Sequence, residues 1–230
     1  MSTMENELQN TYESFKGYKT PELKKRHVKR YDRHFWVTTS CSIDSSVLEI
    51  GCGTGHFLAY LAQKGVKDFQ GIDIDENLRK VIPNEVQDRF DAVDVREYLR
   101  DCDRTFDRVV MFDVLEHFSS DEARELLTSI RKVLSDNGKL LVRVPNMSSP
   151  WASQYQFGDL THKCAFTPSS IRQLAISAEL ESVTVSAFYS KTGLKTLLDR
   201  LLHWFVGKLL VTPPEIWTAN MLIVMEKANS

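Results

Sequence analysis

The chain has 230 residues, of which 42% are hydrophobic, and this is enough to bury the core of one domain. Lys and Arg total 29 against 31 Asp and Glu, so the net charge of −2 excludes a general electrostatic attraction to nucleic acid. Residues 1–9 are polar and acidic and lack the apolar stretch of a secretory signal. The cysteines show neither Cys-x-x-Cys pairs nor zinc spacing, so we predict reduced thiols, a cytoplasmic location and no metal.

The first predicted element is a basic helix over residues 19–33. Pro21 suits the first turn of a helix, and Val28, Tyr31 and Phe35 place apolar side chains on one face. The other face is cationic: it carries Lys24, Lys25, Arg26, Lys29, Arg30 and Arg33. This pattern is typical of a solvated helix face, and the alternative is a cap over a ligand pocket that presents cations to an anionic group.

A glycine-rich turn follows the first predicted strand, Ser46–Ile50, and precedes the helix predicted over Phe57–Lys64. Gly51, Gly53 and Gly55 occupy alternate positions in this turn. Glycine adopts positive φ and lets backbone N–H groups approach a ligand, while the start of the following helix carries a partial positive charge. We therefore predict that a nucleoside binds at this turn.

The position of the third glycine separates two classes of nucleoside site. The dinucleotide fingerprint needs a glycine three residues after the second one, where this chain has His56, and no Gly-Lys-Ser/Thr follows to make a phosphate loop. The third glycine is Gly55, and Glu49 lies two residues before Gly51. The stretch Glu-Ile-Gly-Cys-Gly-Thr-Gly resembles the first motif of class I S-adenosylmethionine-dependent methyltransferases. A nicotinamide-dependent oxidoreductase and a glycine turn without a ligand remain the alternatives.

Acidic residues mark the ends of the next two predicted strands. Asp73 is the last residue of Phe69–Asp73, and Asp94 directly follows Phe90–Val93. Asp73 lies about twenty residues beyond the glycines, where a carboxylate binds both ribose hydroxyls; a helix cap is the alternative. The resemblance implies that Asp94 contacts the adenine amino group and that Val95 lines the ring, although a surface Asp is equally common at such a position. The cofactor contacts implied in full are Glu49, Gly51, Cys52, Gly53, Gly55, Asp73, Ile74, Asp94, Val95 and Phe112.

The fourth predicted strand, Phe106–Phe112, runs into Asp113-Val114-Leu115-Glu116-His117, which resembles a second signature of the same family. Residues at the carboxyl ends of parallel strands face the ligand crevice in open α/β sheets. We therefore expect Phe112 and His117 beside the transferable methyl group. A structural histidine bonded to the backbone is the alternative for His117.

The segment 145–168, after the fifth predicted strand Lys139–Pro145, is long for a connection and has little periodicity, which indicates a functional loop. Its stretch from Asp159 to Thr167 resembles the D-x-T-H-x-x-x-F-T/S segment of small-molecule and sugar O-methyltransferases. The resemblance implies that His162 lines the acceptor pocket. We predict His162, oriented by Asp159, as the first candidate for a general base, and His117 as the second.

The last third of the chain adds predicted strands at Glu181–Phe188 and Trp217–Lys227 and a strongly amphipathic helix at Leu194–Leu210. Asp199 and Arg200 in the middle of this helix argue against a membrane span. Its apolar face either packs on the core or on a second copy in a homodimer, or it forms a lid or a membrane-surface helix that serves a lipid-linked acceptor.

Strands and helices alternate through the middle of the chain, which predicts an α/β fold with a parallel sheet. The resemblance implies a Rossmann-like, doubly wound sheet of seven strands, mostly parallel with one antiparallel C-terminal strand, and helices on both faces. We expect one domain with an N-terminal helical cap (1–45), a cofactor-binding half (46–145) and an acceptor-binding half (146–230).

The predicted activity is methyl transfer from S-adenosylmethionine to a hydroxyl of a small molecule or glycan. The chain lacks the Asn/Asp-Pro-Pro-aromatic segment that amino-methyltransferases of polynucleotides carry after the fourth strand. Methyl transfer to nitrogen, carboxylate or phosphate stays open, as does a non-catalytic cofactor-binding module.

Overall fold

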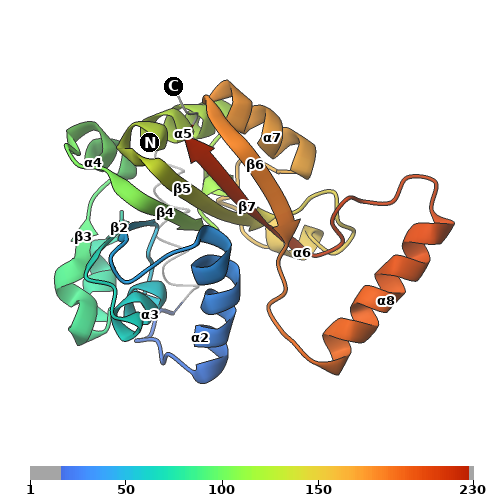
Figure 1. Ribbon diagram of the computed structural model, residues 1–230, viewed down its shortest axis with the longest axis horizontal. Coiled ribbons are helices and arrows are strands. Elements are labelled where there is room, and N and C mark those ends of the chain that lie inside the picture. Colours follow the sequence, from blue (N-terminus) through green and yellow to red (C-terminus); the bar gives the residue numbers. More distant parts are fainter. Residues whose placement is uncertain (1–16, 228–230) are drawn as a thin grey trace.

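The structure of the protein, a computed structural model, describes residues 17–227. Residues 1–9, for which no secretory signal is predicted, and the beginning of the predicted 1–45 cap lie outside the described residues. A seven-stranded sheet with the strand order β3-β2-β1-β4-β5-β7-β6 organises the fold (Figure 1). The strands are β1 Ser46–Ile50, β2 Asp68–Asp73, β3 Phe90–Ala92, β4 Phe106–Phe112, β5 Leu134–Pro145, β6 Leu180–Ala187 and β7 Asn220–Lys227.

The sheet is parallel except at one strand. Strands β1 to β5 pair in parallel, whereas β7 is antiparallel to both of its neighbours, β5 and β6. The sheet grows outward from β1 toward β2 on one side and toward β4 on the other, so the topological switch point lies between β1 and β4. Ligands bind at the carboxyl ends of the strands at such a point. The predicted fold class is confirmed.

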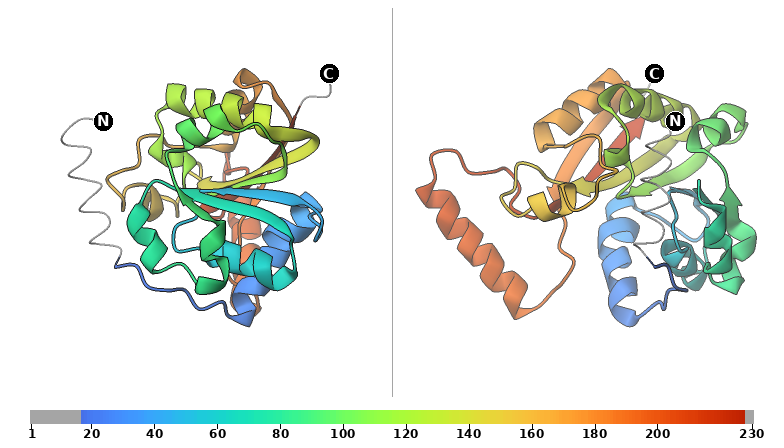
Figure 2. Two further views of the ribbon diagram at one scale, coloured as in Figure 1. Left: turned by 90° about the vertical axis from the view of Figure 1, so that its left-hand side faces the viewer. Right: turned by 180° about the vertical axis from the view of Figure 1, so that it is seen from behind.

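Helices cover both faces of the sheet (Figure 2). Helices α2 and α3 lie on one face, and α4, α5 and α7 lie on the other (Figure 1). The helices are α2 Lys25–Tyr31, the π-helical continuation η1 Asp32–Val37, α3 His56–Lys64, α4 Val95–Asp101, α5 Ser120–Val133, α6 Ser153–Gln156, α7 Pro168–Ser177 and α8 Leu194–Leu209, with 3-10 turns η2 Glu76–Lys80, η3 Asn84–Arg89 and η4 Leu115–His117.

Each face of the sheet buries its own apolar cluster. On one face α3 packs through Phe57 and Leu58, and on the other α5 packs through Leu127 and Ile130; all four side chains are almost fully buried. Burying one such side chain contributes about 1.5–3 kcal/mol. A Cβ atom at Gly71 of β2 would lie 2.6 Å from Leu58 Cδ1, so the glycine lets α3 approach the sheet closely. The two clusters hold the carboxyl ends of the strands in fixed positions.

Most predicted boundaries shift by one to three residues, and at two of them the structure overturns the interpretation of a turn or cap residue. Helix α2 begins at Lys25, because Lys24 is extended, so Pro21 lies before the helix and the prediction of a first-turn proline is wrong. Helix α5 ends at Val133, because the next residue is also extended and pairs with β4. Strand β5 therefore starts before Lys139 and contains the Asn-Gly pair that was expected to terminate the helix.

Helix α8 stands apart from the rest of the molecule in Figure 1 and in the right-hand view of Figure 2. His203 is its one buried residue; the ring stacks on Trp217 at a centroid distance of 4.9 Å and its Nε2 accepts the indole N–H of Trp151 at 3.0 Å. The side chains of Leu201 and Phe205 are 54% and 57% exposed. None of the helices within residues 17–227 has the length and apolar character needed to cross a bilayer.

Candidate cofactor and acceptor site

The glycine turn forms an open cradle at the carboxyl end of β1. Gly51, Gly53 and Gly55 all have positive φ, at +71°, +52° and +73°, a conformation that other residues rarely adopt. A Cβ atom at Gly51 would lie 2.3 Å from Val114 Cγ2, whereas one at Gly53 would meet nothing within 4 Å. The chain after β4 thus packs on the first glycine and leaves open space beside the second.

Asp73, at the end of β2, is turned toward this cradle. Its carboxylate accepts the backbone N–H of Gly53 at 2.9 Å and that of Asp75 at 3.2 Å. Burial raises the pKa of Asp73, against the lowering effect of these two hydrogen bonds. The helix-cap role falls to Asp75, which accepts the N–H of Asn77, so Asp73 keeps the position expected for a ribose ligand. Ile74 follows with half of its surface exposed.

Glu49 is buried on β1 directly before the cradle. Its Oε2 has no hydrogen-bond partner among the described residues, and burial, together with the charge of Asp73, raises its pKa well above the usual value. An unpaired buried carboxylate oxygen is costly unless a donor reaches it. A ligand that brings an ammonium or a sulfonium to this end of the sheet would satisfy it. The open space at Gly53 and the orphaned Glu49 oxygen therefore fit S-adenosylmethionine, which carries both cations.

The other predicted cofactor residues lie around the same edge of the sheet. Asp94 caps α4: its Oδ1 accepts the N–H of Arg96 at 2.7 Å, and its Oδ2 lies 4.0 Å from the Arg96 guanidinium. Val95 is partly buried against the core, and Cys52 is buried beneath the turn. The ring of Phe112 lies at the end of β4.

Helix α2 packs against the start of α3, the helix that follows the cradle. The Tyr31 hydroxyl lies 2.9 Å from His56 Nδ1, and its ring centroid lies 5.9 Å from that of Phe112. His56 is the residue that replaces the third glycine of the dinucleotide fingerprint, and its Nε2 lies 2.9 Å from His27 Nδ1. This histidine thus joins the start of α3 to the N-terminal helix.

Arg143 on β5 lies beside the carboxyl end of β4 and was missed by the sequence analysis. It forms a two-point ion pair with Asp113, whose backbone is in the left-handed region at φ +58°. The guanidinium also lies over the rings of Phe112 and Phe188, at 4.9 Å and 5.0 Å from their centroids. Only the pairing of β4 with β5 places Arg143 beside this turn, and an isolated arginine in a strand carries no sequence signal for it.

The three predicted catalytic residues come together in a second cluster, which we call the imidazole cluster: His117, Asp159 and His162, with Thr161 between them. The His117 and His162 ring centroids are 4.7 Å apart. The Thr161 hydroxyl donates to Asp159 Oδ1 at 2.6 Å and lies 2.9 Å from His117 Nδ1. Burial opposes ionisation of Asp159, but the hydrogen bonds from Thr161 and the neighbouring imidazoles lower its pKa. Asp159 therefore reaches His117 through Thr161, rather than bonding His162 directly.

His162 is oriented by a backbone carbonyl instead. Its Nδ1 lies 2.9 Å from the Gln156 carbonyl oxygen, and its Nε2 lies 3.9 Å from Asp159 Oδ2. The predicted direct orientation by Asp159 is wrong in this respect, because 3.9 Å is too long for a hydrogen bond. A carbonyl only accepts, so Nδ1 carries the proton and Nε2 the lone pair. His162 therefore presents a basic nitrogen to the carboxylate side of the cluster.

Glu116 completes the cluster and was not singled out from the sequence, although it lies in the same motif as His117. Its side chain is fully buried, neither carboxylate oxygen has a hydrogen-bond partner within residues 17–227, and Oε1 lies 4.0 Å from His162 Nε2. Burial, with the charge of Asp113 adding to it, raises the pKa of Glu116 to about 8. Its backbone carbonyl accepts the N–H groups of Lys163 and Cys164, which fastens the 146–166 loop to the end of β4.

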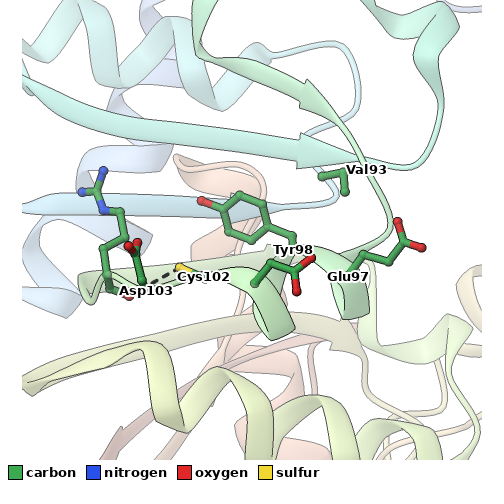
Figure 3. Close-up of a pocket in the computed structure, with 7 residues that line it drawn as sticks. Val93, Glu97, Tyr98, Cys102 and Asp103 are labelled. Atoms are coloured by element: carbon green, nitrogen blue, oxygen red, sulfur yellow. Dashed lines mark hydrogen bonds between the residues drawn. The ribbon is translucent and has the colours of Figure 1, made fainter.

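A separate pocket of about 380 Å³ lies beside α4 (Figure 3). The Tyr98 ring points across it, and Cys102 and Asp103 close one end (Figure 3). Val93 is the one lining residue next to a predicted cofactor contact. None of the residues that line this pocket belongs to the glycine cradle or to the imidazole cluster.

Comparison with known proteins identifies the family. Residues 20–185 match the family described as a methyltransferase domain. An S-adenosylmethionine-dependent methyltransferase from Archaeoglobus fulgidus is similar over 95% of this chain and 99% of its own, with a TM-score of 0.68 and 21% identity. Magnesium protoporphyrin IX methyltransferase from Synechocystis PCC 6803, solved with bound S-adenosylhomocysteine, is similar over 96% and 94% of the two chains, with a TM-score of 0.57 and 15% identity.

A probable mRNA-capping enzyme of Acanthamoeba polyphaga mimivirus is 29% identical over 133 residues. The match covers 57% of this chain, and the chain spans only about 10% of that relative's length. The chain belongs to the methyltransferase-domain family, and S-adenosylmethionine is the cofactor of this class. The predicted class is confirmed, and the nicotinamide-dependent alternative is not supported.

Proposed function

We propose that this methyltransferase transfers the methyl group of S-adenosylmethionine to a hydroxyl of a small molecule or glycan. The observation that carries this proposal is the imidazole cluster, in which His162 Nε2 bears a lone pair near the end of β4, the strand that pairs with β1. A hydroxyl is a poor nucleophile until its proton is removed, and a positioned base accelerates such a step by about 10²–10⁴-fold. Transfer to a carboxylate or phosphate would need no base.

In this proposal the cofactor lies across the glycine turn. The backbone of Gly51, Cys52, Gly53 and Gly55 contacts the methionine part and the sugar, and Asp73 accepts both ribose hydroxyls. Asp94 accepts the adenine amino group, with Ile74 and Val95 on the ring. Glu49 receives the cationic end of the cofactor, which satisfies its unpaired oxygen, and Phe112 faces the sulfonium. Two observations support this arrangement: the hydrogen bond from Gly53 to Asp73, and the unpaired oxygen of Glu49.

Without a bound ion, the reaction needs one proton acceptor. The acceptor oxygen forms a bond to the methyl carbon while the carbon–sulfur bond breaks, and sulfur keeps the bonding pair and leaves as neutral S-adenosylhomocysteine. The hydroxyl proton passes to His162 Nε2, which later releases it to water. His117 and Asp159, joined by Thr161, line the acceptor side. Holding the two reactants in line supplies up to roughly 7–11 kcal/mol of the barrier reduction.

We extend the proposal to the organisation of the chain as one domain. Residues 46–145 bind the cofactor, residues 146–230 bind the acceptor, and the N-terminal cap (1–45) closes the cradle through Tyr31 and His56. The four cysteines are unpaired, in keeping with the predicted cytoplasmic location. The exposed apolar face of α8 is suited either to a membrane surface that presents a lipid-linked saccharide or to a second copy in a homodimer.

The test has two stages. Calorimetry with the full chain should detect S-adenosylhomocysteine but not NADH, and Asp73→Asn should weaken that binding. Incubation with S-adenosylmethionine and panels of saccharides, lipid-linked saccharides and phenols should then yield a product heavier by one methyl group. A methyl ether survives mild alkali and a methyl ester does not, so an alkali-labile product would contradict the hydroxyl acceptor. Cofactor binding without transfer to any acceptor class would favour a non-catalytic module.

A further inference from the structure

The imidazole cluster has the arrangement of a metal site, although the spacing of the cysteines predicted none. One ligand atom from each of His117, Asp159 and His162 lies within 4.8 Å of the other two. We propose that these three residues bind one divalent transition-metal ion, with the buried carboxylate of Glu116 beside it as a fourth ligand. The ligands come from η4 and from the 146–166 loop, so neither segment alone shows the site.

The hydrogen bonds fix the tautomers of both imidazoles. His162 Nδ1 donates to the Gln156 carbonyl at 2.9 Å, which leaves the lone pair on Nε2. Thr161 has one hydroxyl proton and gives it to Asp159, so the hydroxyl accepts from His117 Nδ1 at 2.9 Å. Metal-ligating histidines almost always donate their other ring N–H to such a carbonyl or polar group, which orients the ring.

The distances around His162 Nε2 point to a cation between the groups. Asp159 Oδ2 lies 3.9 Å away and Glu116 Oε1 lies 4.0 Å away. An imidazolium hydrogen-bonded to a carboxylate would bring the atoms to about 2.7–2.9 Å, and three lone-pair-bearing atoms without a cation would repel each other. Two ligands of one zinc ion, each bonded at about 2.0–2.2 Å, stand about 3.3–3.5 Å apart in a tetrahedron. Shortening the two distances at His162 Nε2 by about half an ångström would bring these atoms to the spacing of ligands of one ion.

Burial provides an independent argument. Glu116 is fully buried and both of its oxygens lack hydrogen-bond partners among residues 17–227. The side chains of Asp159 and His162 are only 12% and 8% exposed. A buried carboxylate without a donor is costly, and a bound cation removes this cost. The carboxylate of Glu116 thus lacks a hydrogen bond, and its Oε1 lies near His162 Nε2, as Asp159 Oδ2 does.

The ligand types select the kind of ion. Two imidazole nitrogens with one or two carboxylates suit Zn²⁺, Mn²⁺ or Fe²⁺, whereas Mg²⁺ and Ca²⁺ prefer oxygen alone. Such an ion, with open coordination positions, would hold oxygen atoms of the acceptor and take over from His162 the activation of the hydroxyl. This role rests on the proposed function; the binding of the ion does not.

The experiment measures binding directly. The full chain is stripped with EDTA, dialysed and titrated with Zn²⁺ and Mn²⁺ by calorimetry, and Co²⁺ is added for its absorption spectrum. We expect one ion per chain and a cobalt spectrum without thiolate charge-transfer bands, which excludes the free cysteines as ligands. Asp159→Asn and His162→Gln should each weaken binding at least tenfold. Thr161→Val, which removes the hydrogen bond behind His117 and Asp159, should weaken it about 10–100-fold.

Asp136→Asn is the matched control, because this carboxylate is 98% exposed at the far end of β5 and its loss should leave ion binding unchanged. Thermal unfolding and S-adenosylhomocysteine binding of every variant show that the fold and the cradle persist. A stoichiometry below one for all three ions, or affinity retained in both Asp159→Asn and His162→Gln, would overturn the metal site. Either result would leave the proposed methyl transfer standing if the cofactor still binds.

Discussion

The glycine turn and helix α8 differ in how tightly the rest of the chain packs against them. At the turn, Gly51 fits against Val114, Asp73 accepts the backbone N–H of Gly53, and Tyr31 of α2 contacts His56. Along α8, His203 is the single buried side chain. The turn is therefore packed against other parts of the chain, whereas α8 leaves most of its apolar side chains exposed.

The difference follows from the position of the two regions in the sheet. The turn lies at the switch point, where α2, α3 and the chain after β4 all converge on the end of β1. Helix α8 lies in the connection between the edge strand β6 and β7, and it touches the body through Trp151 and Trp217.

The largest expected effect is on the acceptor side. His162→Gln should lower kcat by about 10²–10⁴-fold, because it removes Nε2 whether that nitrogen acts as a base or binds an ion. Affinity for S-adenosylhomocysteine should stay within about twofold, since the cradle is a separate cluster. His203→Gln serves as the comparison, a histidine of α8 outside the cluster. Equal losses of kcat in the two variants would contradict the assignment.

On the cofactor side, two glycines with left-handed backbones give a matched pair. Gly53 and Gly65 both have positive φ and space for a Cβ atom, but only Gly53 faces the cradle. Each substitution by Ala should cost about 1 kcal/mol of stability through its left-handed backbone. Only Gly53→Ala should weaken S-adenosylhomocysteine binding, by about tenfold or more, as measured by calorimetry. Unchanged affinity in Gly53→Ala would show that the open space is not the cofactor site.

Substitutions in α8 should change association with a partner but not the stability of the fold. Leu201→Glu combined with Phe205→Glu changes exposed side chains, so the free energy of unfolding should move by less than about 0.5 kcal/mol. The same double variant should lose vesicle binding or dimerisation, whichever the unmodified chain shows in flotation and light-scattering experiments. The matched change Lys195→Glu alters charge at an exposed position of the same helix without removing apolar surface. A large loss of stability in the double variant would mean that α8 packs on the core.

The smallest effect concerns the closure of the cradle by α2. Burial, with the nearby His27, lowers the pKa of His56 to about 4, so the folded state binds fewer protons than the unfolded state between about pH 4 and 6.5. Stability should therefore fall as pH drops through this window, on the order of 1 kcal/mol after solvent screening is allowed for. Urea unfolding at pH 7 and pH 5 measures it. His56→Gln should reduce the difference between the two pH values, and an unchanged difference would assign the pH dependence to other groups.

Much of the fold was predictable because it depends on local patterns. Strands β1 and β4 have the predicted bounds, since an apolar run before a glycine turn and an apolar run before an acidic motif have clear ends. Pro168 begins α7 behind the cap residue Thr167, as expected. The error at the start of β5 occurred because pairing of Leu134 with Phe106 of β4 outweighed the local signal of the Asn-Gly pair.

The amino-acid sequence by itself determined the strand–turn–helix around Gly51 and the position of Asp73, because positive φ and hydrophobic periodicity are properties of neighbouring residues. Only the tertiary structure decided that Arg143 pairs with Asp113, that the carboxylate of Glu116 is buried without a hydrogen bond, and that the 146–166 loop brings His162 to the end of β4. These groups are far apart along the chain, and nothing in a local pattern encodes a distance that strand pairing and loop packing create.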